Sequence, residues 1–260
     1  MNVKILMIGD VVRSPGVGYL AKGGRLRETV KKTGARLTVV NGENAADGNG
    51  ITPDAADALF FAGADVVTGG NHTLLRAEIF GALDDDRRLL RPANLPGDTP
   101  GMGYGIFDAG GVFVLVANLL GQIFMDPVNS PFDTLSRILE RERGNFDIAV
   151  VDFHAEATSE KGAFARYFDG KVSVVAGTHT HVATADCAVL PGGTGFITDL
   201  GMTGSRAGIL GVRTDCVIKK LVNRLPSRFE GAVGNEAASG ALFEIDPASG
   251  RCVSAQSIIF

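Results

Sequence analysis

The sequence predicts an α/β protein built on one mixed sheet or on two packed sheets. In the first half of the chain, short apolar runs alternate with helical patterns, which is typical of a parallel sheet with right-handed crossovers. The middle and the end of the chain each contain two apolar runs joined by a short turn, the pattern of a hairpin. A chain of 260 residues can form one large domain of this kind, so we expect a single domain over 1–260.

In the first half, the apolar runs are short and continuous, as in strands that are buried on both faces. Ser14-Pro15 and Thr52-Pro53 resemble helix starts, in which an oxygen-bearing cap precedes a proline in the first turn. The predicted strands are Val3 to Ile8, Leu37 to Val40 and Val66 to Thr68, and the predicted helices are Val17 to Lys32 and Pro53 to Ala62.

The second half adds two hairpins, two helices and two buried strands. The first helix is charged and amphipathic, and the strands on either side of the second helix resume the continuous apolar pattern. In order, we expect a hairpin of Tyr104 to Asp108 with Val112 to Ala117, a helix at Pro131 to Arg143, a strand at Ile148 to Phe153, a helix at Ser159 to Phe168, a strand at Val172 to Gly177, and a hairpin of Ala241 to Ile245 with Cys252 to Ile259.

Composition and charge argue against several classes of protein. Hydrophobic residues make up 45% and charged residues 21% of the chain, which supplies a buried core and gives no sign of disorder. The net charge is −4 and the basic residues are dispersed, so we expect neither stable nucleic-acid binding nor a membrane-surface footprint. The apolar run Ile5 to Ile8 is too short for a signal peptide, and no run approaches the ~20 residues of a membrane span.

The three cysteines, Cys187, Cys216 and Cys252, are widely spaced and form no Cys-x-x-Cys pair. They indicate neither a disulfide framework nor a thiolate zinc site. A reducing cytoplasm is therefore the expected location. Glycine- and alanine-rich helices could also pack between subunits of a homo-oligomer.

All four histidines lie in three short segments: Gly70-Asn71-His72, Asp152-Phe153-His154 and Gly177-Thr178-His179-Thr180-His181. Histidine is the commonest metal ligand and a frequent proton carrier near neutral pH. Polar residues also follow the predicted strands at their carboxyl ends, where open α/β sheets place their ligands. These residues are Asp10, Glu43, Asn71, His154 and His179.

Such a set of imidazole, carboxylate and amide groups suits Mn, Fe, Zn or a similar ion, and it exceeds one tetrahedral site. Two ions ~3.5 to 4 Å apart can clamp the attacking and departing oxygens of a phosphoryl transfer. Two carboxylates leave such a pair of divalent ions with a charge of about +2, which a phosphate ester would neutralise. His72, directly after Asn71, could act as a general acid toward the leaving group.

Five stretches of the chain together resemble the calcineurin-like metallophosphoesterases and, more closely, the YmdB-type bacterial subgroup of cyclic-nucleotide phosphodiesterases. The resemblance continues through Ile197 to Gly204 and so covers nearly the whole chain. In combination the motifs are highly specific. They are Gly9-Asp10, Asn41-Gly42-Glu43-Asn44, Gly70-Asn71-His72, Val151 to Lys161, and Gly177 to Val182.

The resemblance implies a four-layer αββα sandwich, in which two mixed sheets lie between helices. It implies two divalent or trivalent metal ions, with Fe, Mn and Zn all open, and His72 as the proton donor. The implied substrates are small cyclic nucleotides, the 2′,3′-cyclic forms first and 3′,5′-cyclic forms in addition. The implied ligands are Asp10, Glu43, Asn44 and His181 at one metal, and Glu43, Asn71, His154 and His179 at the other, with Glu43 as the bridge.

The chain departs from the family pattern at several positions. The usual Asp-x-His of the superfamily is here Asp10-Val11-Val12, and Glu43 stands where an aspartate bridge is usual, both of which belong to the subgroup. Within the subgroup, Arg13 replaces an expected glycine and Cys187 an expected acidic residue. These two changes bear on substrate preference and not on metal binding.

Each of these residues also has a purely structural interpretation. An isolated histidine after a strand is usually a hydrogen-bonded structural residue, and Asn44 or Asn71 could adopt a left-handed turn. Glu156 and Glu160 are expected in the first turn of a helix, where carboxylates favour the helix dipole, and we assign them no chemistry. The segment Asp47 to Gly50 lacks the rest of a calcium loop and is interpreted as a turn.

The leading hypothesis is a dinuclear metal phosphodiesterase in which a bridging hydroxide attacks phosphorus and His72 protonates the leaving alkoxide. An amidohydrolase-like metal hydrolase also contains His-x-His, but there the pair lies on the first strand, whereas here His179 and His181 come late. The alternative from another class is a regulatory protein that binds metal and nucleotide with little or no turnover.

Overall fold

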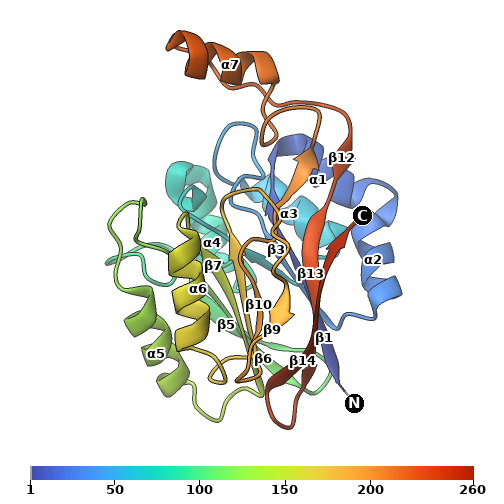
Figure 1. The fold of residues 1–260 in the computed structure, drawn as a ribbon, viewed down its shortest axis with the longest axis vertical. Coiled ribbons are helices and arrows are strands. Elements are labelled where there is room, and N and C mark those ends of the chain that lie inside the picture. Colours follow the sequence, from blue (N-terminus) through green and yellow to red (C-terminus); the bar gives the residue numbers. More distant parts are fainter. Residues whose placement is uncertain (1) are drawn as a thin grey trace.

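The computed structural model describes residues 2–260, in which two mixed sheets pack face to face with helices on both outer sides (Figure 1). In the first sheet, β1, β3 and β4 are parallel, and the C-terminal hairpin is added antiparallel to β1. The first sheet has the order β14 (Arg251–Ile259), β13 (Ser239–Asp246), β1 (Val3–Ile8), β3 (Leu37–Asn41) and β4 (Val66–Thr68).

The second sheet has a parallel centre, β6, β7, β8 and β10, with one antiparallel strand at each edge. Antiparallel edge strands on a parallel sheet are common in α/β proteins. Its order is β5 (Tyr104–Asp108), β6 (Phe113–Leu120), β7 (Ile148–His154), β8 (Val174–Thr178), β10 (Gly195–Ile197) and β9 (Ala188–Val189).

Alternation along the strands builds three apolar layers. In β1, Ile5 and Met7 face the second sheet and pack with Val150 and Val174 in the central core, while Leu6 faces the outer helices, because successive side chains of a strand point to opposite faces. The first sheet is covered by α1 (Arg13–Ala21), α2 (Arg25–Thr33), α3 (Pro53–Ala62) and α4 (Phe80–Asp85), and the second by α5 (Pro131–Arg141) and α6 (Thr158–Tyr167). The four-layer αββα prediction is confirmed.

The predicted elements recur with small shifts of their ends, except for the first helix. Instead of one helix over Val17 to Lys32, the structure has α1 and α2, because Gly23 and Gly24 adopt left-handed φ angles of 63° and 69° between them. A helix does start at Ser14-Pro15, with α1 beginning one residue earlier at Arg13, but the predicted capping role of Ser14 is wrong, because its hydroxyl instead donates to the Asp47 carboxylate. The Thr52 cap is confirmed, since its hydroxyl accepts from the Ala55 N–H at 3.2 Å.

Several elements were not predicted from the sequence. A third, three-stranded sheet joins β12 (Glu236–Ala237), β11 (Met202–Ser205) and β2 (Asp10–Val11), and it fixes Asp10 beside Met202. Helix α7 (Thr214–Asn223) projects beyond the sheets at one end of the molecule (Figure 1). Within residues 2–260, no helix combines the length and the apolar character needed to cross a membrane.

Candidate metal centre

The loops that follow five parallel strands meet at one edge of the sheets. Strands β1, β3 and β4 of the first sheet and β7 and β8 of the second all end at this edge, so their loops converge although they are distant in sequence. A continuous series of side-chain contacts of 3.8 Å or less joins all eight predicted site residues. Asn71 and His179 both contact His154, and from there the series continues in order through Glu43, His72, Asn44 and His181 to Asp10.

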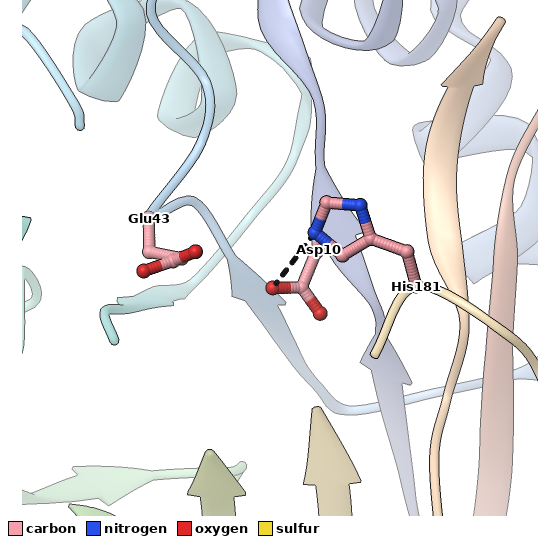
Figure 2. Close-up of side chains that lie close together, drawn as sticks. All are labelled: Asp10, Glu43 and His181. Atoms are coloured by element: carbon pink, nitrogen blue, oxygen red, sulfur yellow. Dashed lines mark ion pairs between the residues drawn. The ribbon is translucent and has the colours of Figure 1, made fainter. Parts of the chain in front are cut away.

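One part of the centre consists of Asp10, Glu43 and His181. Each offers a ligand atom within 4.8 Å of the other two, and Figure 2 shows the Asp10 carboxylate facing the His181 ring, with Glu43 beside them. The Asp10 Oδ1 atom is buried and has no hydrogen-bond partner. Burial, together with the negative charges of Glu43 and Asp199, raises the pKa of Asp10 well above its usual value. Buried charged groups are normally paired or coordinate a metal, so a buried carboxylate oxygen without a partner indicates a site for a cation.

Asn44 belongs to the same part of the centre. Its amide donates to the Glu43 carboxylate and lies 3.4 Å from the His181 Nε2 atom. Asn44 lies in a turn, but its φ angle is not positive, so the left-handed conformation is not adopted. Its contacts bring it beside the other candidate ligands.

The second part consists of His154, Asn71 and His179. The His154 Nε2 atom lies 3.0 Å from the Asn71 Oδ1 atom and 3.0 Å from the His179 Nδ1 atom, and 3.6 Å from the Glu43 Oε2 atom. Burial lowers the pKa of His154 to about 3 and also lowers the pKa of His179, so both rings are neutral at neutral pH. Neutral imidazole is the form that binds metals.

A buried relay behind His154 fixes which of its nitrogens carries the proton. The Thr178 hydroxyl donates to the Asp152 carboxylate at 2.6 Å, so toward the His154 Nδ1 atom, 2.9 Å away, it can only accept. The proton therefore sits on Nδ1, and the Nε2 lone pair points into the centre. Outer-shell partners of this kind orient metal-binding histidines.

His179 has a comparable partner on the solvent side. Its Nε2 atom lies 3.0 Å from the Glu156 carboxylate, which is an acceptor, so the Nε2 proton points outward and the Nδ1 lone pair points toward His154. Glu156 precedes α6 and does not lie in its first turn, so the sequence-based interpretation of this residue was wrong. Glu160 does lie in the first turn, where it accepts from the backbone N–H groups of Gln122 and Ile123.

His72 lies at the surface of the centre. Its backbone N–H donates to the Glu43 Oε2 atom at 2.8 Å, and its ring Nδ1 atom lies 3.1 Å from Glu43 Oε1 and from Asn44 Oδ1. The hydrogen bond to Glu43 raises the pKa of His72. The other ring nitrogen is 3.4 Å from the Asn49 amide, on the wall of the pocket described below.

Two features of the backbone shape the centre. At Gly70, a Cβ atom would lie 2.5 Å from the His154 Nε2 atom and 2.6 Å from the Glu43 Oε2 atom, so any side chain here would fill the space among the ligands. His179 and His181 have positive φ angles of 104° and 65°, a conformation that L-residues adopt at a cost. The buried Lys161–Asp199 ion pair supports this loop, because Asp199 also accepts from the Thr180 N–H.

A pocket of about 430 Å³ opens over the centre. It combines the metal-type ligands with one cation, Arg13, and with an apolar wall from the chain segment around α7. The segment Asp47 to Gly50, predicted as a turn, contributes Gly48 and Asn49 to its rim. The remaining lining residues are Val12, Glu43, Asn44, His72, Glu156, His179, Thr180, His181, Leu210, Val212 and Phe229.

Known proteins resemble this chain over nearly its whole length. The model of the family described as YmdB-like protein matches residues 6–258. A 2′,3′-cyclic-nucleotide 2′-phosphodiesterase of Bacillus subtilis is 43% identical over 257 residues, which is 99% of this chain and 97% of that protein.

Two solved structures are similar over nearly the full length. A hypothetical protein from Thermus thermophilus has a TM-score of 0.92 and 37% identity, with 99% of each chain covered. A phosphatase from Mycoplasma pneumoniae has a TM-score of 0.93 and 30% identity, covering 100% of this chain and 94% of that one.

Proposed function

The chain belongs to the YmdB-like protein family, and we propose that it is a dinuclear metal-dependent phosphodiesterase that opens the cyclic phosphate of small nucleotides. The Bacillus relative bears the name of a 2′,3′-cyclic-nucleotide 2′-phosphodiesterase at 43% identity. We accordingly propose 2′,3′-cyclic nucleotides as the main substrates, with the 2′ oxygen as leaving group and the nucleoside 3′-phosphate as product. We propose 3′,5′-cyclic nucleotides as additional substrates.

The observation that carries the proposal is the convergence of lone pairs around His154. The relay from Thr178 and the acceptor Glu156 leave no proton on His154 Nε2 or on His179 Nδ1, yet these atoms are 3.0 Å apart. Nitrogen ligands lie about 2.0–2.1 Å from such an ion, so two of them at right angles are about 3 Å apart. The spacing is that of two ligands of one cation.

The residues present fit two cations. The orphaned Asp10 Oδ1 atom, Glu43 and His181, with Asn44, would hold one, and Asn71, His154 and His179 would hold the other. Glu43 contacts both sets and would bridge them. When bound, such a pair supplies an activated water and offsets the charge that develops on the phosphoryl oxygens.

The residues of the chain would do three things during the reaction. His72 has a ring nitrogen on the pocket wall and would protonate the departing 2′ oxygen. Its contacts with Glu43 and Asn44 hold the ring in place. The apolar wall of Leu210, Val212 and Phe229 would bind the nucleoside base.

The test is an assay of metal-loaded protein on bis-p-nitrophenyl phosphate, 2′,3′-cyclic AMP and 3′,5′-cyclic AMP, beside the variants His72→Ala and Glu43→Ala. Loss of a positioned general acid costs about 10²–10⁴-fold in rate, so we expect a loss of that size for His72→Ala and a loss of metal as well for Glu43→Ala. The matched control is Glu140→Ala, an exposed carboxylate on α5, which should match wild type.

Equal activity in wild type and both site variants would overturn the mechanism. An absence of turnover in wild type, with metal and nucleotide still bound, would instead identify a regulatory binding protein. Elemental analysis of the purified protein would report whether two ions or one are bound, and which metal.

A further inference from the structure

The pocket contains a nearly buried cation that the proposed chemistry does not use. Arg13 lines the pocket and is only 8% exposed. Within residues 2–260, its side chain makes one hydrogen bond, from Nη2 to the Phe229 carbonyl oxygen at 3.4 Å. It forms no ion pair with any of these residues. A guanidinium has five N–H donors, so most of them have no partner among these residues.

Burying a charge without a partner is costly, and buried charges are normally paired. Arg13 also has a φ angle of 59°, which a residue with a Cβ adopts at a cost. Its backbone is held there, because its N–H donates to the Asn44 carbonyl oxygen at 2.7 Å. A strained, nearly buried and unpaired arginine next to a ligand of the centre indicates an anion that arrives with the substrate.

The position of the guanidinium indicates which anionic group this is. The side chain extends toward the apolar wall, where its Nη2 contacts Phe229 and its Cδ would lie 3.1 Å from a Cβ at Gly231. It makes no hydrogen bond or ion pair with Asp10, Glu43 or the four histidines. The scissile phosphate would be held among those ligands, so Arg13 is placed for a different phosphate of the same molecule.

We propose that Arg13 determines substrate specificity by binding a second phosphate, so that the enzyme prefers 2′,3′-cyclic nucleotides that also carry a 5′-phosphate. The terminal nucleotide of an RNA chain cleaved by attack of a 2′-hydroxyl has a comparable pair of phosphates, a 2′,3′-cyclic phosphate and a 5′ phosphate that is a diester to the preceding nucleotide. Arginine suits this task because its planar fork matches a phosphate in a bidentate manner. The inference rests on the proposed phosphodiesterase function.

The experiment compares kcat/KM for 2′,3′-cyclic AMP with and without a 5′-phosphate. For wild type we expect a ratio of roughly ten or more in favour of the 5′-phosphorylated substrate, the size of effect that charge-assisted hydrogen bonds provide. Arg13→Gly should bring this ratio to about one, and Arg13→Lys should restore part of it. Glycine accepts a positive φ without strain, so the variant should fold, and its melting curve checks this.

The matched control is Arg224→Gly. Arg224 is also an arginine with a positive φ angle, 55°, but it is exposed at the end of α7 and does not line the pocket. The Arg224→Gly variant should show the same ratio of kcat/KM values, with and without the 5′-phosphate, as wild type. A wild-type ratio near one, or an Arg13→Gly ratio equal to wild type, would overturn the inference while leaving the phosphodiesterase intact. If wild type hydrolyses neither substrate, the proposed function itself fails.

Discussion

The His154 Nε2 atom and the His179 Nδ1 atom lie 3.0 Å apart and face each other. The hydroxyl of Thr178 holds the proton of one ring on its far side, and the carboxylate of Glu156 holds that of the other. Two neutral nitrogen lone pairs repel each other at this distance unless a cation lies between them. Thr178 and Glu156 therefore support the proposed metal site, although neither is a proposed ligand.

Thr178→Val should weaken metal binding about 10–100-fold. Valine has the shape of threonine but cannot accept from the His154 Nδ1–H, so the tautomer that directs Nε2 toward the metal loses its support. Calorimetric titration of the metal-free protein measures the change. Thr178→Ser keeps the hydroxyl and should bind metal nearly as wild type does, and equal affinity in the valine variant would contradict the role of the relay.

Glu156→Ala should also lower metal affinity, with little effect on the free energy of unfolding. The Glu156 side chain is 49% exposed, so its loss leaves no cavity, but His179 loses the acceptor that fixes its ring. We expect a loss within the 10–100-fold range of outer-shell substitutions, measured by the same titration. The exposed Glu140→Ala variant serves as control, and a lower Tm of the metal-free Glu156→Ala protein would point to a structural role instead.

Removal of the metal with EDTA should lower Tm, and return of Mn²⁺ or Zn²⁺ should restore it. A ligand at 100 times its Kd stabilises the folded state by about 2.7 kcal/mol, which is about 5–10 °C for a chain of this size. Differential scanning calorimetry at two metal concentrations measures this change, and Tm should be higher at the higher concentration. A Tm that does not respond to EDTA, in protein shown by elemental analysis to have lost its metal, would contradict a metal-stabilised fold.

In metal-free protein, Asp10→Asn should become increasingly stabilising relative to wild type as the pH rises. Burial and the charge of Glu43 raise the pKa of Asp10 in the folded state. A group with a raised folded pKa contributes its full stability below its unfolded pKa, about 3.9, and loses it as the pH rises through the folded pKa. Asparagine keeps the shape without the charge.

Urea unfolding of both proteins from pH 4 to pH 8, in EDTA, gives the difference in free energy of unfolding between wild type and Asp10→Asn. The lowered pKa of His154 makes the free energy of unfolding rise with pH in both proteins. Because this contribution is common to wild type and Asp10→Asn, it cancels in the difference. With metal bound the sign should reverse, because the carboxylate is then a ligand and the amide is a weaker one. A difference that does not change with pH would contradict the burial argument.

Local patterns in the sequence were enough to predict most of the elements. Continuous apolar runs predicted β1, β3, β4 and β7 because these strands are buried on both faces. The short strand β2 has no such pattern, since its two residues are held by pairing with β11, nearly two hundred positions away. Helix α7 was missed because it packs little against the sheets and leaves apolar residues such as Leu221 and Val222 exposed, so no burial pattern marks it.

By itself, the sequence determined which residue types the centre has available and at which strand ends they stand, because a strand and the loop after it are local in the chain. The tertiary structure alone decided how the ring nitrogens are oriented, since the partners Thr178, Asp152 and Glu156 act through hydrogen bonds that depend on angstrom-scale geometry. It also decided that Arg13 is buried in the pocket beside Phe229. Their positions are more than two hundred residues apart, and only long-range packing of the two sheets and the segment around α7 brings them together.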